Sequence, residues 1–290
     1  MITWWSLALF ISLGSCVFLN LNKKHQLEGL RARGWSTLIA FLILSPSLFL
    51  VEFPKEPAFY LCAFIGGTLM SFVGEIYFNL SAKYGGPVVS LARPISIIFA
   101  FFVWTAIAPS ETIEMLSRPV VLLGVLASFA LAIWGQIRMV KDNVNVKRAL
   151  KFLIAAAFLG GLTAPVVKYG MSFTWEFSHV FLWSFFFHLS GSVMCFCRHA
   201  LKRNNQPMYS KEFMRFGITL GPYHASFGPM FSYALLLAPN PAFVGLLGML
   251  STVWLMLYYK VRGQDSHVRP RSVAMLLSAA VILIVATKGL

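Results

Sequence analysis

Residues 118–137 read RPVVLLGVLASFALAIWGQI, twenty residues whose only charged side chain is Arg118 at the start. An α-helix needs about 20 predominantly apolar residues to cross the hydrocarbon core of a bilayer. A helix satisfies its own backbone polar groups, which lipid cannot do. Nine further stretches of this kind predict an all-α integral membrane protein with ten transmembrane helices: 3–21, 34–52, 58–80, 87–108, 152–171, 176–197, 213–237, 241–259 and 272–289.

Basic residues are concentrated in every second connection between these stretches. The odd-numbered connections hold nineteen Lys and Arg residues, and the even-numbered ones hold three. Short loops rich in Lys and Arg stay in the cytoplasm, so the odd-numbered connections are predicted to be cytoplasmic and both termini external. The nineteen are Lys23, Lys24, Arg31, Arg33, Lys83, Arg138, Lys141, Lys147, Arg148, Lys151, Arg198, Lys202, Arg203, Lys211, Arg215, Lys260, Arg262, Arg269 and Arg271, and the three are Lys55, Arg118 and Lys168.

The composition excludes a soluble protein. With 58% apolar residues among 290, a soluble chain of this kind would expose large apolar patches. A net charge of +14 would suggest nucleic acid as the partner of a soluble protein, but here the charge lies in connections where it meets anionic head groups. We therefore expect a multi-pass protein of a plasma membrane, such as the bacterial inner membrane, with membrane lipids and no nucleic acid as partners.

The sequence has no motif of an enzyme or of a cofactor site. His-Glu-x-x-His, Gly-x-Ser-x-Gly and the P-loop do not occur, so we predict no catalytic residues, no cofactor and no ATP-driven transport by this chain alone. Cys195 and Cys197, together with His199, could ligate a metal. Packing of the two cysteines at a helix end is the favoured interpretation.

The second half of the chain repeats the first in outline. A shift of 154 positions places Gly74 over Gly228 and Pro87 over Pro241, each proline opening an apolar stretch. A repeat of five helices crosses the membrane an odd number of times, so its second copy must be inverted. We predict a 5+5 inverted repeat with a substrate site between the halves, near the bilayer midplane. The two halves are 1–140 and 141–290, and they form one membrane domain.

Three stretches follow a known pattern: YGGPVVSLARPISIIFAFF at 84–102, RPVVLLGVLA at 118–127 and SYALLLAPNPAFVG at 232–245. The first two resemble helices three to five of the drug/metabolite transporter superfamily, in particular its EamA-type ten-helix members, and the third echoes them. The resemblance implies a 5+5 inverted-repeat bundle. It also implies alternating-access transport, often export, of small organic solutes such as amino acids, nucleosides, sugars or drugs.

The chain departs from that family in two ways. Ten-helix members usually close the fourth and ninth helices with a Gly-Glu pair, whereas the corresponding residues here are AIAP at 106–109 and YYKV at 258–261. The family is usually drawn with both termini in the cytoplasm, whereas the distribution of Lys and Arg predicts external termini. A divergent or inverted branch is therefore expected.

Two charged residues inside the stretches are candidates for substrate binding or coupling, because charges in a membrane are costly and usually functional. Glu75 and Arg93 each lie about six residues from the cytoplasmic end of consecutive helices. Their equal depth predicts an ion pair between them. Its role could be a buried salt bridge that fixes helix register. Alternatively, Glu75 could bind a coupling proton or a substrate amine, while Arg93 holds Glu75 or a substrate carboxylate.

Four further residues complete the candidate site. His188 and His224 lie near the middle of the seventh and eighth stretches, and Tyr223 precedes His224. Each imidazole could accept a proton or hydrogen-bond a neighbouring helix, and the second interpretation is favoured. Lys168, near the outer end of the sixth stretch, is predicted to extend its amine to the outer surface. A contact with an anionic substrate group is the alternative for Lys168.

These observations predict a secondary transporter of a small polar or amphipathic metabolite, with proton coupling as an option and homodimerisation left open. A flippase for a lipid-linked sugar or a phospholipid is the first alternative. A membrane-embedded enzyme acting on lipid head groups is the second, although the sequence lacks the motifs that such an enzyme needs.

Overall fold

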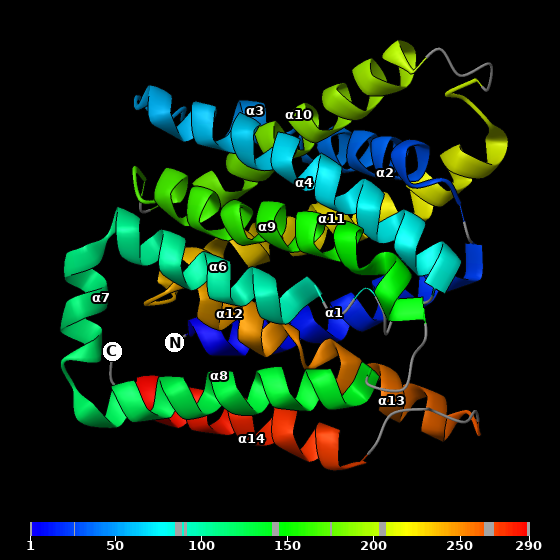
Figure 1. Cartoon of the computed structure of the whole chain (residues 1–290). Helices are drawn as coiled ribbons and strands as arrows, with labels where there is room; N and C mark the ends of the chain where they lie inside the picture. The colour runs from blue at the N-terminus through cyan, green and yellow to red at the C-terminus, as the bar shows by residue number, and fades with distance from the viewer. Residues whose placement is uncertain are drawn as a thin grey trace.

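A computed structural model describes residues 2–25, 27–84, 89, 92–140, 145–174, 176–202, 207–263 and 270–288. All regular secondary structure in these ranges is helical. Among the residues named above, Pro87, Lys141, Arg203 and Arg269 lie outside the described ranges. The helices are α1 Trp4–His25, α2 Gly29–Leu44, α3 Ser47–Leu50, α4 Pro57–Tyr84, α6 Ala92–Ile107, α7 Pro109–Leu116, α8 Pro119–Val140, α9 Asn145–Met171, α10 His179–Leu201, α11 Lys211–Leu237, α12 Pro241–Gly248, α13 Ser251–Val261 and α14 Pro270–Thr287 (Figure 1).

Several of these helices can cross a membrane, and the prediction of an all-α membrane protein is confirmed at that level. In the described part of the chain, seven segments are long and apolar enough, or eight if the bent pair α6–α7 is one span. The seven are Gly29–Leu50, Pro57–Ser81, Pro119–Arg138, Lys151–Met171, His179–Leu201, Pro241–Val261 and Pro270–Thr287. The predicted stretch 213–237 forms the long helix α11 but is not among them, because its polar, glycine and proline residues dilute its apolar content.

The helices run roughly alongside one another, and helices from the two halves of the sequence alternate in space (Figure 1). Helix α2 packs against α10 and α11, and α4 packs against α9 and α10. At one edge, α8 packs against α14. Both chain ends and α7 lie at the same end of the bundle, on the left of Figure 1.

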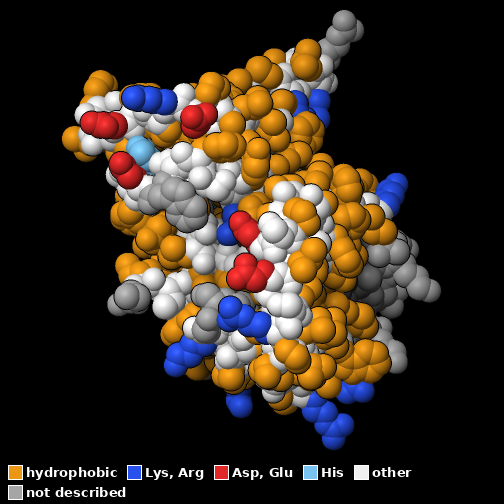
Figure 2. Space-filling view, turned by 90° about the vertical axis from the view of Figure 1, so that its left-hand side faces the viewer, with side chains coloured by type: hydrophobic (Ala, Val, Ile, Leu, Met, Phe, Trp, Pro, Cys, Tyr) orange, Lys and Arg blue, Asp and Glu red, His pale blue; other side chains and the backbone are white. Residues whose placement is uncertain are grey.

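The two ends of the bundle differ in charge. The end that faces the viewer in Figure 2 carries acidic as well as basic groups on a largely apolar surface. The acidic residues in its connections and on α7 are Glu52, Glu56, Glu111, Glu114 and Glu176. At the opposite end, the last turns of α4, α8, α10 and α13 carry basic residues, namely Lys83, Arg138, Arg198 and Lys260. The alternation of charge in the sequence therefore corresponds to two electrostatically different ends.

Glycines allow the helices to approach closely where the two halves meet. A Cβ atom added to Gly67 of α4 would lie 2.0 Å from the carbonyl oxygen of Phe187 in α10. A Cβ atom added to Gly161 of α9 would lie 2.8 Å from the carbonyl oxygen of Ser96 in α6. Small residues at helix contacts are the usual means of close packing in membranes. These contacts hold the helices that position the interior polar residues.

Candidate functional site

Three basic side chains from three helices meet inside the bundle. Arg33 of α2 is only 3% exposed, and its Nη1 lies 3.2 Å from Nε2 of His224 in α11. The ring of His224 lies 5.8 Å, centroid to centroid, from that of His188 in α10. We call Arg33, His188 and His224 the interior basic cluster. The two histidines were predicted separately from the sequence, and the structure brings them together.

The position of Arg33 contradicts the sequence-based prediction, which placed this residue in a cytoplasmic connection. Helix α2 begins at Gly29, so Arg33 is already in its second turn and points into the bundle. The space for its side chain comes from Gly74 of α4, where an added Cβ would lie 2.8 Å from Cδ of Arg33. The sequence signal for the buried position of Arg33 was Gly74, one of the residues matched by the repeat.

Polar groups around the cluster have unused hydrogen-bonding capacity. Within the described part of the chain, Nε of Arg33 and Oγ of Ser184 are buried and have no hydrogen-bond partner. Ser184 and His188 both face Gly228 of α11: an added Cβ there would lie 3.0 Å from Nε2 of His188 and 3.5 Å from Oγ of Ser184. Buried polar groups are nearly always paired in proteins. The cluster therefore has the chemistry of a binding site.

Glu75 pairs with two cations, and neither is Arg93. One carboxylate oxygen lies 2.6 Å from Nη1 of Arg198, and the other accepts a hydrogen bond from Nζ of Lys202 at 2.9 Å. Both cations lie at the basic end of α10. The predicted Glu75–Arg93 ion pair is therefore wrong. Helix α10 lies against α4 and supplies the partners of Glu75 instead.

Arg93 points in another direction, toward the interruption between α12 and α13. Its Nη1 donates to the carbonyl oxygen of Gly248 and, at 2.6 Å, to Oγ of Ser251. Helix α12 ends at Gly248 and α13 begins at Ser251. A helix end leaves carbonyl groups without intrahelical partners. The guanidinium of Arg93 therefore satisfies a carbonyl that the break exposes and joins α6 to the second half.

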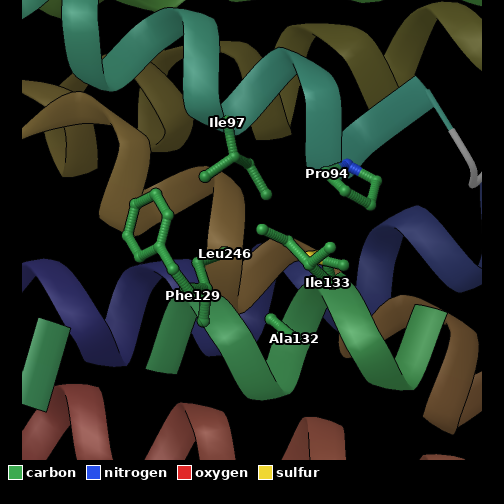
Figure 3. Close-up of a pocket in the computed structure, with 7 residues that line it drawn as sticks. Pro94, Ile97, Phe129, Ala132, Ile133 and Leu246 are labelled. Atoms are coloured by element: carbon green, nitrogen blue, oxygen red, sulfur yellow. The ribbon is translucent and has the colours of Figure 1, made fainter. Parts of the chain in front are cut away.

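An apolar crevice lies next to Pro94, the residue that follows Arg93 in the chain (Figure 3). Helices α6, α8 and α12 line it, and Met249 completes it. Since every lining side chain is apolar, the side chains of this crevice offer no hydrogen bonds to a polar group. The lining residues are Pro94, Ile97, Phe129, Ala132, Ile133, Leu246 and Met249.

Tyr223 and Lys168, the remaining predicted site residues, do not join the cluster in the same way. The ring of Tyr223 lies 5.4 Å from that of its neighbour His224 but stacks on Phe227 at 4.5 Å. Lys168 is buried rather than extended to the outer surface, so that prediction is wrong. Its Nζ donates to the carbonyl oxygens of Leu236, at 3.2 Å, and Ala238, at 2.6 Å. These carbonyls lie at the end of α11, where a cation is favourable.

The described residues give no support to the metal alternative. No group of three His, Cys, Asp or Glu side chains that could hold a metal ion occurs among them. Cys195 is buried, whereas Cys197, two positions later on α10, is exposed. The two thiols therefore face different surroundings.

Comparisons with known proteins identify a shared fold without a function. No family model and no curated protein matches this chain. Twenty-six chains of solved structures match. One of them, titled "Crystal structure of protein", superimposes with a TM-score of 0.67 at 13% sequence identity, covering 98% of this chain and 97% of its own. The likeness spans the whole chain and, at this identity, concerns the fold alone.

Proposed function

We propose that the protein is a secondary transporter that moves a small polar or amphipathic metabolite by alternating access. The observation that carries the proposal is the interior basic cluster, to which the first half contributes Arg33 and the second half contributes His188 and His224. A polar site at the interface between two halves is the arrangement expected of inverted-repeat carriers. Ionisable residues inside a membrane domain mark substrate or proton pathways by default.

The same proposal includes ten transmembrane helices arranged as a 5+5 inverted repeat. The contacts between helices support the repeat when each helix of the first half is matched with one of the second half. The matched pairs are α1 with α9, α2 with α10, α4 with α11, α6 with α12–α13, and α8 with α14. The contact of α2 with α11 then corresponds to that of α10 with α4, and the contact of α4 with α9 corresponds to that of α11 with α1. Three further contacts, α2–α10, α6–α12 and α8–α14, each join two matched helices, so exchanging the halves leaves these contacts unchanged.

Two glycines support the repeat at the level of single residues. Gly74 and Gly228 are related by the shift of 154 positions. Gly74 lies against Arg33 of α2, and Gly228 lies against Ser184 and His188 of α10, the proposed counterpart of α2. Equivalent glycines in both halves therefore admit polar side chains to the same interior region. An alternating-access carrier requires an interface that can pack in two equivalent ways.

The surroundings of Glu75 bear on the candidate roles. A carboxylate that already has two cationic partners, Arg198 and Lys202, is poorly suited to bind a substrate amine. We therefore assign Glu75 to the contact between α4 and α10 at the basic end. If transport is coupled to protons, His188 and His224 are the candidate carriers, because they are titratable side chains that meet inside the bundle.

Reconstitution into proteoliposomes tests the proposed function. We expect the purified protein to move at least one soluble metabolite from a panel of amino acids, sugars, nucleosides, carboxylates and phosphate esters, about tenfold faster than protein-free vesicles. The assay is run with and without a proton gradient, and labelled phospholipids are assayed in parallel. Movement of lipid together with failure of every soluble solute would instead identify a flippase.

The proposed orientation places the basic end in the cytoplasm and both termini outside. We expect alkaline phosphatase fused after the last residue to be active, and a green fluorescent protein at the same position to be dark. Fusions in the connection between α10 and α11, at the basic end, should give the opposite pair of results. A fluorescent C-terminal fusion would refute the orientation and leave the fold unaffected.

A further inference from the structure

The charge of Arg33 has no counter-charge in the described interior. None of the ion pairs among the described residues includes Arg33. The buried carboxylate of Glu75 is already shared by Arg198 and Lys202. The guanidinium of Arg33 lies instead beside the imidazole of His224, which carries no negative charge. Among the described residues, the positive charge of Arg33 is therefore buried without a carboxylate partner.

A buried guanidinium in this situation is costly to the folded protein. Arginine keeps its proton in proteins, so it cannot become neutral as a buried lysine or glutamate can. An isolated buried charge is unfavourable unless it is paired and hydrogen-bonded. A binding partner that supplies a negative charge would therefore stabilise this state of the protein, and the partner that a transporter provides is its substrate.

The groups around Arg33 suit an anionic oxygen group in particular. The guanidinium presents donors in a planar fork that matches a carboxylate or a phosphate. Its Nε has no hydrogen-bond partner among the described residues, and the same holds for Oγ of Ser184. The backbones at Gly74 and Gly228 pack closely against the cluster: an added Cβ would lie 2.9 Å from Nε of Arg33 and 3.0 Å from Nε2 of His188, respectively. The site thus combines a charge with uncommitted hydrogen-bonding groups.

We propose that the substrate carries a carboxylate or phosphate group that binds Arg33, with His188 and Ser184 as additional hydrogen-bonding partners. This inference rests on the proposed function, because it specifies the substrate of the same site. The anionic group can belong to a soluble metabolite or to a lipid head group. A purely structural role of Arg33, in which its bond to His224 holds α2 against α11, is the competing explanation.

Thermal unfolding of the purified full-length protein in detergent separates these explanations. The soluble probes are inorganic phosphate, glycerol 3-phosphate, succinate and glutamate, at constant ionic strength, with glycerol and succinamide as neutral counterparts. Phosphatidylglycerol is compared with phosphatidylcholine as the lipid arm. We expect at least one anion, soluble or lipid, to raise Tm by about 5 °C near saturation, and its neutral counterpart to have no effect.

Three variants identify the residue responsible. Arg33→Gln should lose the shift caused by the anion, and Arg33→Lys should show a smaller one, because an ammonium lacks the planar fork. Arg215→Gln is the matched control: it also removes one positive charge, from an exposed position on α11, and should keep the shift. Without ligand, Arg33→Gln should unfold at the same temperature as the natural protein or higher, since it removes an uncompensated charge.

The outcomes distinguish this inference from the proposed function. A lower ligand-free Tm of Arg33→Gln with an unchanged shift would establish the structural role and overturn the inference. The inference also fails if no anion, soluble or lipid, raises Tm. Transport of a neutral solute by Arg33→Gln at the natural rate would overturn the inference and leave the transporter intact. Arg33-dependent anion binding without transport of any soluble solute would support the inference and overturn the proposed function.

Discussion

Replacing Gly67 with alanine is expected to prevent accumulation of folded protein, whereas the same replacement of Gly66 is expected to be tolerated. The Cβ of an alanine at 67 would lie 2.0 Å from the backbone oxygen of Phe187, which cannot move without displacing α10. At 66 it would lie 3.2 Å from Cε2 of the Phe187 ring, which can rotate away. Overpacking of this severity costs about 3 kcal/mol or more.

Size-exclusion chromatography of a fluorescent fusion measures the yield of folded protein for both alanine variants. A second substitution, at Ser190, tests which atom of α10 obstructs the added methyl group. The added methyl group would also lie 2.1 Å from Oγ of Ser190, so Ser190→Ala would restore folding if the hydroxyl were the obstacle. We expect no rescue, because the carbonyl of Phe187 remains. Equal yields for the variants at 66 and 67 would mean that α4 and α10 are not packed as closely as described.

The second large effect is expected at Glu75. Glu75→Gln leaves Arg198 and Lys202 without a carboxylate at the contact of α4 with α10. Loss of one partner from a buried ion pair typically costs about 3–5 kcal/mol. Since the Lys202 side chain is 42% exposed, water partly replaces the lost charge, and we expect about 2–3 kcal/mol, read as a lower Tm.

A double-mutant cycle separates this interaction from general damage. Arg198→Met in the Glu75→Gln background removes a cation that has lost its partner, so the double variant should be more stable than Glu75→Gln alone. Glu28→Gln is the comparison at a more exposed pair, in which Nε of Arg31 lies 2.6 Å from Oε2 of Glu28, and should cost about 0.5 kcal/mol. If the effects of Glu75→Gln and Arg198→Met simply add, the two residues do not interact.

The class of fold could be predicted because the signal is local. The stretch 118–137 contains enough apolar residues to predict a spanning helix without knowledge of its neighbours, and the structure has α8 there at Pro119–Val140. The limits of this signal are evident in α11, where Pro222, Tyr223, His224 and Pro229 interrupt the apolar sequence. Such residues are accommodated by contacts with other helices, which a single stretch does not contain.

The residues of the site were harder to predict, because depth can be counted along a helix but direction around it depends on packing. Counting along the two helices predicted equal depth for Glu75 and Arg93, yet Glu75 faces α10 and Arg93 faces the break at residues 249–250. Arg33 was missed because it directly precedes an apolar stretch and was counted with the loop. His188 and His224 were selected by depth alone, and only the packing of α10 and α11 brings their rings together.

The acceptor of Arg93 on Gly248 is a main-chain oxygen, and the acceptors of Lys168 on Leu236 and Ala238 are main-chain oxygens too. Changing the side chains at 236, 238 or 248 therefore leaves those oxygens in place. Substitution of the acceptor residues therefore does not remove these main-chain contacts. The Glu75–Arg198 contact, in contrast, requires compatible side chains at both positions. In an alignment, Lys168 would be retained without a covarying partner, and Glu75 would change together with Arg198.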